Sequence, residues 1–304
     1  MTTAPPSAWQ QRVEGVWHGL PAVFDAAGAP LGCVRVTRGI TRDAAGQPVF
    51  HVHNVAEFEG PLRARLAQPD LVLHVVDEGA ARVYHGRDFH GAGQPFGATL
   101  LGSDYIQPWG VDTAVIVQVL PDGEAQVYSA QLYQGPTLLG VIHGRYQLIR
   151  GADTPAEAAL AAFLAGERAA GPETILGHSG RWRGELTVQA VGGAAEAAVS
   201  ATVAWEQSGN GRVGCEAVWE GPAGRRLRFL RRDEGAQCFF DGPDVFGNGQ
   251  AFGRALFSTQ HLRGEALTLR TREVWLGSAG LAVVWQVFFG VQLRQVMAGV
   301  LRPA

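Results

Sequence analysis

The sequence contains no lysine, and arginine supplies all 25 basic side chains. A chain without lysine cannot form a lysine Schiff base, which excludes pyridoxal-phosphate enzymes and lysine aldolases. It also lacks the lysine of a standard P-loop. The motifs GxSxG and HExxH and a Cys–His signature are missing, so the common hydrolase patterns are absent. These absences remove several enzyme classes before any fold is considered.

Cysteine is also scarce. Cys33, Cys215 and Cys238 are odd in number and widely spaced, so they predict neither a disulfide framework nor a CxxC metal clamp. The first 11 residues have no apolar stretch followed by a cleavage site, which predicts no signal peptide and a cytoplasmic protein. The net charge of −3 comes from scattered charges, so we expect no nucleic-acid partner.

One uncharged segment, residues 274–293, has about the length of a membrane span. Gly277 and Gly280 lie inside it, and Gln286 and Gln292 interrupt it. Two strands around a turn explain this pattern better, so we predict no membrane span.

The chain repeats itself. Residues 77–100 recur at residues 233–256 with 12 identities in 24 positions, all shifted by 156. Further matches extend the repeat through most of the chain, for example Gln131 with Gln286. A long duplicated unit predicts two domains rather than a solenoid of short repeats.

The predicted domains are residues 1–150 and 176–304, joined by a helical linker over residues 151–175. Asp153-Thr154-Pro155 has the composition of a helix start, and Gly171-Pro172 ends the run. Leu160, Phe163 and Leu164 follow the spacing of one helix face between them.

Within each unit, short apolar or alternating segments are separated by turn residues. Residues 113–120 and 125–133 flank Pro121-Asp122-Gly123-Glu124, which is a hairpin signal. Regular strands with such turns predict an antiparallel meander that closes into a barrel, because closure removes apolar sheet edges. The predicted fold class is therefore all-β, with two tandem antiparallel up-and-down β-barrels joined by a short α-helix.

A Gly-x-Trp motif opens each unit after a short helical segment, at Trp17 and at Trp182. This arrangement resembles the signature of lipocalins and other calycins, in which the tryptophan plugs the closed end of the barrel. Ser103-Asp104-Tyr105 is similar to the second motif of that family, but Ser258-Thr259 in the second unit does not keep it. The tandem form resembles double-calycin proteins, which include uncharacterised bacterial proteins, hydratases of the hydroxyneurosporene type and Diels–Alder-type cyclases. The resemblance implies two calycin-like barrels and transfers no catalytic residue.

A barrel of this kind either packs its interior or holds one small ligand. Large aromatic residues are the first candidates for ligand contacts, and core packing is the alternative for each of them. The candidates are Tyr84, Tyr105 and Trp109 in the first unit and Trp219, Phe229 and Trp285 in the second.

Polar residues inside apolar strands are the second group of candidates. Pairing Leu120 with Ala125 places Gln118 and Gln131 on one face, as possible ligand contacts. A shift of 155 predicts the same relation for Glu273 and Gln286. A buried Glu273 would have a raised pKa and could transfer protons near neutrality. The alternative is an exposed Glu273 paired with an arginine.

We therefore name Glu273, Gln286 and Tyr133 as candidate catalytic residues. His143, which Ala298 replaces in the second unit, is a candidate ligand contact, either as a haem ligand or as a proton donor. His51 and His53 share one face of a strand, but the opposite face is more apolar, so they are expected to point away from the core. We expect no metal site and no cofactor.

The predicted function is binding of a small apolar molecule in a barrel lumen or in a cleft between the barrels. The alternative is a cofactor-independent cyclase, isomerase or hydratase on a polyene or polyketide-like substrate, since such chemistry needs a shaped apolar pocket and one or two proton-handling groups. A third possibility is an interaction module with filled barrels. The sequence does not indicate the ligand, the occupied barrel or the oligomeric state.

Overall fold

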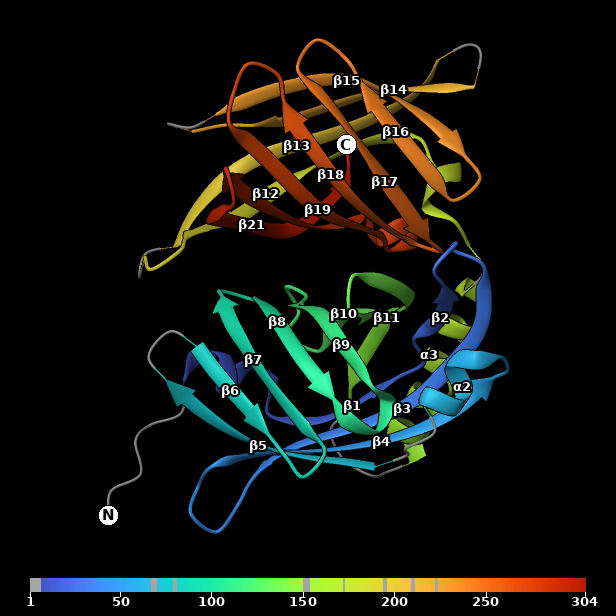
Figure 1. The fold of residues 1–304 in the computed structure, drawn as a ribbon, viewed down its shortest axis with the longest axis vertical. Coiled ribbons are helices and arrows are strands. Elements are labelled where there is room, and N and C mark those ends of the chain that lie inside the picture. Colours follow the sequence, from blue (N-terminus) through green and yellow to red (C-terminus); the bar gives the residue numbers. More distant parts are fainter. Residues whose placement is uncertain are drawn as a thin grey trace. The chain divides into compact units, whose positions relative to one another are not determined.

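The chain folds into two units, Met1–Pro172 and Glu173–Ala304, in a computed structural model (Figure 1). The structure describes residues 7–66, 70–78, 81–149, 154–171, 173–193, 196–208, 211–221 and 224–304. Gly79 and Ala80 of the repeat and Asp153 of the predicted helix start lie outside these residues.

The first unit is an antiparallel barrel. Its sheet runs in the order β1-β11-β10-β9-β8-β7-β6-β5-β4-β3-β2. Additional pairings of β1 with β3 and of β2 with β11 close it, so β1 and β2 together fill one strand position. The strands are β1 (Gly15–Gly19), β2 (Ala22–Asp25), β3 (Pro30–Arg42), β4 (Pro48–Phe58), β5 (Asp70–Glu78), β6 (Ala81–His85), β7 (Phe89–Phe96), β8 (Thr99–Ile106), β9 (Val111–Val119), β10 (Ala125–Gln134) and β11 (Thr137–Leu148).

The second unit is a closed barrel of ten strands, in which each strand pairs with the next along the chain and β21 returns to β12. Two antiparallel up-and-down barrels are therefore confirmed. The strands are β12 (Gly180–Ala190), β13 (Glu196–Ser208), β14 (Arg212–Trp219), β15 (Arg225–Glu234), β16 (Gln237–Asp241), β17 (Val245–Phe252), β18 (Ala255–Leu262), β19 (Leu267–Trp275), β20 (Leu281–Phe289) and β21 (Gln292–Pro303).

Helical segments are few and short. The predicted helix between the barrels is present as α3 (Thr154–Ala170), and Glu167 near its end accepts a hydrogen bond from the backbone N–H of Arg145 on β11. The other segments are α1 (Ala8–Val13), α2 (Pro61–Arg65), η1 (Gln107–Trp109), η2 (Ile175–Gly177) and η3 (Gly277–Ala279). Of the helices within the described residues, none combines the length and the apolar character that crossing a membrane requires.

The predicted hairpin between β9 and β10 illustrates how local sequence sets the register. The Asp122 carboxylate accepts hydrogen bonds from the backbone N–H groups of Glu124 and Ala125, and Gly123 takes a φ of 72°. This φ is costly for residues with a Cβ, so glycine suits the turn. The turn places Gln118 opposite Val127, as predicted.

In each unit a buried arginine of the barrel bonds to a short helical segment. In the first unit Trp17 is fully buried and its indole donates to the Val13 carbonyl at 2.8 Å. Arg82, buried on β6, donates to the side chain of Gln10 in α1 at 2.7 Å. In the second unit Arg231 on β15 donates to the backbone carbonyl of Leu176 in η2 at 3.1 Å.

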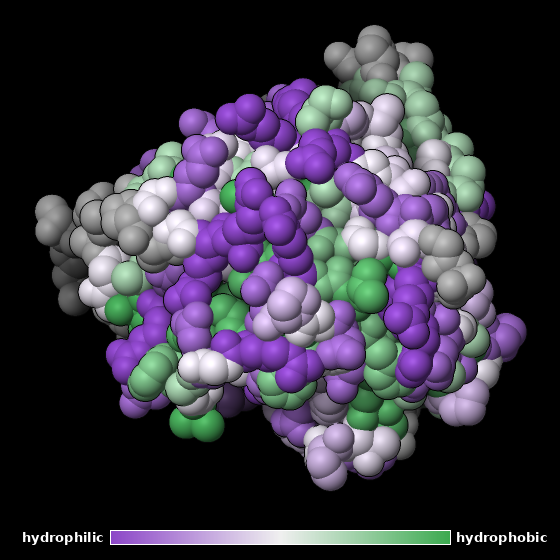
Figure 2. All heavy atoms as spheres, turned by 90° about the horizontal axis from the view of Figure 1, so that it is seen from above, coloured by the Kyte–Doolittle hydropathy of each residue, from purple (hydrophilic) through white to green (hydrophobic). Residues whose placement is uncertain are grey.

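Strand residues alternate between the two faces of each barrel wall. The alternation leaves polar side chains outside, and hydrophilic residues cover much of the face shown in Figure 2, with hydrophobic residues in small groups between them. The apolar positions therefore concentrate in two separate cores, one inside each barrel.

Candidate functional site

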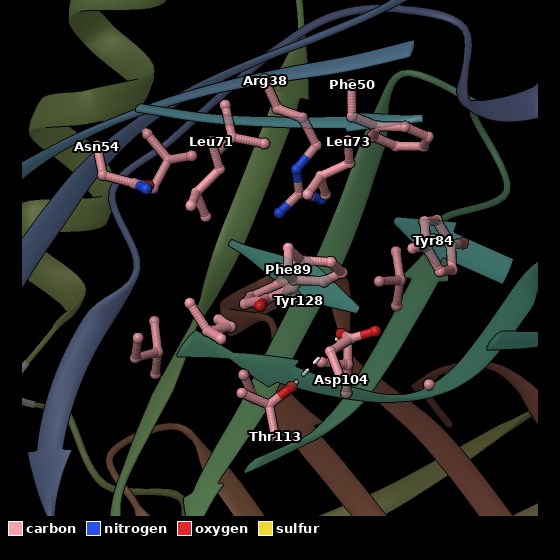
Figure 3. A pocket seen from close by; sticks show the side chains of 18 of the residues that line it. Arg38, Phe50, Asn54, Leu71, Leu73, Tyr84, Phe89, Asp104, Thr113 and Tyr128 are labelled. Carbon is pink, nitrogen blue, oxygen red and sulfur yellow. Dashed lines mark hydrogen bonds between the residues drawn. The ribbon is translucent and has the colours of Figure 1, made fainter. Parts of the chain in front are cut away.

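The lumen of the first barrel contains a cavity of about 150 Å³ (Figure 3). A dry apolar cavity of roughly this size, about 150 Å³, is large enough to bind benzene in another protein. Most of the wall is aliphatic or aromatic. The apolar lining includes Val34, Val36, Ile40, Phe50, Leu71, Leu73, Phe89, Leu100, Ile106, Val115, Val117, Leu132 and Ile142.

The lumen of the second barrel is filled by its side chains, and the void that they leave measures about 20 Å³. Trp219 and Trp285 pack with ring centroids 5.7 Å apart, and Phe229 packs against Phe240 at 5.4 Å. A void of about 20 Å³ holds one water molecule at most.

Side-chain volume at repeated positions explains the difference. Gln131 pairs with Val141, and Gln286 pairs with Val296, so β10 and β20 correspond with a shift of 155. Trp285 therefore stands where the first barrel has Ala130. By the shift of 156 in the earlier strands, Phe229 stands where the first barrel has Leu73. Larger residues at matching lumen positions fill the second barrel, and smaller ones leave the first barrel hollow.

A positive charge projects into the first cavity. Arg38 follows Val34 and Val36 on the lumen face of β3. Its guanidinium lies over the rings of Tyr128 and Tyr146, 5.0 and 4.9 Å from their centroids. Figure 3 shows it pointing into the cavity, toward Phe89 and Tyr128. Among the described residues it forms no hydrogen bond or ion pair, so its N–H groups remain available to a ligand.

A carboxyl group lies on another part of the wall. Asp104 on β8 accepts a hydrogen bond from the Thr113 hydroxyl at 3.4 Å. Burial raises the pKa of Asp104 to about 7, although the charge of Arg38 opposes this effect. A side chain at position 91 would collide with this carboxylate, so Gly91 on the neighbouring strand makes room for it.

Two further donors lie in the cavity wall. The indole nitrogen of Trp109 and the amide nitrogen of Gln126 are buried and have no hydrogen-bond partner among the described residues. Burial also raises the pKa of Tyr128 and raises that of Tyr146 to about 12, so both phenols stay neutral. The cavity therefore combines an apolar wall with several unused donors and one carboxyl group.

The polar groups of the second lumen largely bond to one another. Gln260, the counterpart of Asp104, donates to Ser258 at 3.0 Å, and Ser258 bonds to Thr271 at 2.7 Å. Trp285 donates to Glu273 at 3.3 Å, and burial raises the pKa of Glu273 to about 7. Glu273 is thus a buried carboxyl as hypothesised, but the void that it lines measures about 20 Å³, which is too small for an organic ligand.

The candidates from the sequence fall into three groups. Tyr84 and Trp109 line the first cavity. Four residues line the second lumen: Glu273, Trp219, Phe229 and Trp285. The others lie on outer faces of strands, next in sequence to lumen residues: Tyr105, Gln118, Gln131, Tyr133, His143 and Gln286.

The prediction that Glu273 and Gln286 share a face is wrong. Glu273 pairs with Val283, and Gln286 pairs with Arg270, so the two side chains point to opposite faces. The error arises from the hairpin. Trp275 and its partner Leu281 are six positions apart, whereas Val119 and its partner Gln126 are seven positions apart. One residue lost from the second hairpin changes the shift from 156 in β19 to 155 in β20, so Glu273 corresponds to Val117 in the lumen and not to Gln118.

The structure places His143 on the outer face of β11, where its Nδ1 lies 3.2 Å from the Ser129 hydroxyl. In contrast, Arg38 and Asp104, the charged side chains that line the first cavity, were not among the candidates from the sequence. Arg38 carries a readable signal, because it shares the alternation of Val34, Val36 and Ile40. Asp104 appeared only within a motif resemblance.

Within the described residues, no group of three or more histidine, cysteine, aspartate or glutamate side chains could hold a metal ion. The chain matches no family model and no curated protein. It is similar to a crystal structure of a protein of unknown function from the DUF3598 family of Nostoc punctiforme PCC 73102, with 13% identity and a TM-score of 0.61. That alignment covers 99% of this chain and 100% of the other, and it shows a shared two-barrel fold.

A second similar structure is a putative outer membrane protein from Bacteroides fragilis NCTC 9343, with 11% identity over 97% of this chain and 100% of the other. Its TM-score of 0.24 is too low to indicate a common architecture.

Proposed function

We propose that the first barrel binds a small, largely apolar organic molecule in its lumen. The observation that carries this proposal is the hollow lumen itself, with about 150 Å³ of space, beside a matching lumen in the same chain that is filled. An empty apolar cavity costs about 24 cal/mol per Å³, which gives roughly 4 kcal/mol here. Trp285 shows that a single tryptophan fits this fold, so retention of the cavity indicates a use for it.

The polar groups support the same proposal. Binding pockets are usually apolar with a few polar groups that orient the ligand. Arg38, Trp109 and Gln126 present donors to the cavity without partners among the described residues. Unpaired buried donors are costly, and a ligand that accepts hydrogen bonds would recover this cost.

The direct test is native mass spectrometry of freshly purified protein, which would detect a retained ligand by its added mass. The matched test is Ala130→Trp, which copies the filled barrel, against Ala114→Trp on the exposed outer face of β9. We expect Ala130→Trp to abolish binding of 1-octanol in calorimetry and Ala114→Trp to leave it unchanged. Ala130→Leu serves if the tryptophan variant does not fold. Equal binding by the wild type and a folded lumen variant would refute the proposal.

A second candidate function is cofactor-independent cyclisation, isomerisation or hydration of a polyene or polyketide-like substrate. Asp104 favours it, because a carboxyl group with a pKa of about 7 in an apolar cavity can donate or accept a proton near neutrality. Asp104 thus replaces Glu273 as the residue to test. With the recovered ligand as substrate, Asp104→Asn is expected to abolish turnover and to retain binding. Unchanged turnover would remove Asp104 from the mechanism.

A further inference from the structure

Three hydrogen-bond donors in the first cavity have no acceptor among the described residues. Arg38 has no hydrogen bond or ion pair among the described residues and is held by the rings of Tyr128 and Tyr146. Trp109 and Gln126 add two buried N–H donors. Arg38 is half-buried, and a cation that loses part of its water without gaining a partner is unfavourable, so the site gains most from an anionic acceptor.

We infer that the ligand of the first barrel carries a carboxylate headgroup that binds to Arg38, and that Asp104 makes this binding sensitive to pH. The inference rests on the proposed function and specifies its ligand. A guanidinium matches the planar geometry of a carboxylate, to which it donates two parallel hydrogen bonds.

The charge balance favours a single negative charge. The titratable or charged side chains that line the cavity are Arg38, Tyr84, Asp104, Tyr128 and Tyr146. Of the described residues that line the cavity, Arg38 is the one cation, while the nearby Arg82 over the Tyr84 ring bonds to Gln10. Asp104 becomes an anion at higher pH. A doubly charged phosphate would keep an uncompensated charge in an apolar lumen, which is costly. While Asp104 is protonated, a carboxylate with one negative charge neutralises Arg38 and leaves no uncompensated charge in the cavity.

Among the described residues Asp104 and Arg38 form no direct ion pair, but both line the same cavity and the charge of Arg38 acts on Asp104. A protonated Asp104 can donate a hydrogen bond to the carboxylate, whereas an ionised Asp104 repels it. Since the pKa of Asp104 lies at about 7, affinity for a carboxylate should fall as pH rises through neutrality. For this pKa, the expected loss between about pH 6 and about pH 8 is up to about tenfold.

The test uses three probes of equal chain length in isothermal titration calorimetry: octanoate, octanamide and 1-octanol. Octanoate stays ionised between about pH 6 and about pH 8. We expect Arg38→Met to weaken octanoate about 10- to 100-fold and to leave 1-octanol unchanged. The control is Arg35→Met, which makes the same change on the exposed face of the same strand. Arg38→Lys restores the charge and should recover part of the preference, which also covers a failure of Arg38→Met to fold.

The pH arm uses Asp104→Asn, for which octanoate affinity should no longer depend on pH between about pH 6 and about pH 8. Asp112→Asn, on the exposed face of β9, is its control and should keep the wild-type dependence. If octanamide binds as tightly as octanoate and Arg38→Met changes neither, the carboxylate assignment is wrong while lumen binding stands. If none of the three probes binds, lumen binding itself is refuted.

Discussion

Asp104→Asn should change the pH dependence of stability in a way that can be calculated from the structure. Burial raises the pKa of Asp104 from 3.8 to about 7 in the folded barrel. Between these values the folded state holds a proton that the unfolded state has released. The wild type therefore loses stability as pH rises from about 4 to about 7, and its dependence ends above the folded pKa.

The magnitude follows from the size of this change. Raising the pKa of Asp104 from 3.8 to about 7, at about 1.36 kcal/mol per pH unit, costs the folded state about 4 kcal/mol. This figure is an upper limit, because Asp104 retains some solvent contact. Between about pH 5 and about pH 8 the same relation gives about 3 kcal/mol. An asparagine has no such titration, so the variant should gain on the wild type by up to this amount as pH rises.

The assay is hydrogen exchange of β8–β10 peptides with mass spectrometry, which reports the free energy of opening of the first barrel at each pH. The quantity compared is the difference between the variant and the wild type. Asp112→Asn removes an exposed carboxylate from the adjacent strand and should show little pH-dependent difference. A difference for Asp104→Asn that stays constant from about pH 5 to about pH 8 would show that Asp104 is not desolvated as described.

Two predictions concern the second barrel. Burial raises the pKa of Glu273 from 4.5 to about 7, so Glu273→Gln should gain up to about 3 kcal/mol on the wild type by about pH 8, measured by exchange of β19–β20 peptides. If the difference in opening free energy between Glu273→Gln and the wild type does not change with pH, Glu273 is not buried as described. Trp285→Ala should destabilise the second barrel by about 3–5 kcal/mol in urea unfolding and open a cavity there. A loss below about 1 kcal/mol would mean that the lumen repacks.

Much of the fold could be predicted because it depends on local and periodic features. The Asp122-Gly123 turn set the β9–β10 register, and the alternation along β3 placed apolar residues on one face. The 156-residue shift showed that the chain contains two related units. These signals are visible in the sequence itself, since side chains of a strand alternate with a period of two and a turn occupies only a few residues.

The functional site was harder to predict. The hypothesis for Glu273 and Gln286 failed in part because the shift is 156 in β19 and 155 in β20, and a register difference of one residue moves a side chain to the other face. Apart from Tyr105, which lies on an outer face, the aromatic candidates for ligand contacts divided between the two lumens, and a list of residues does not show which lumen is hollow.

Repetition, the all-β class and the closed meander were readable in the amino-acid order, because period, turn chemistry and self-similarity are local properties. The cavity was not readable, because free volume is a difference between a barrel's interior and the side chains that many distant strands bring into it. Whether Ala130 leaves a cavity and Trp285 fills one depends on the strands that close around each residue. The approach of Arg38 to Tyr128 and Tyr146, with Asp104 in the same lumen, likewise joins four strands that only tertiary pairing brings around one space.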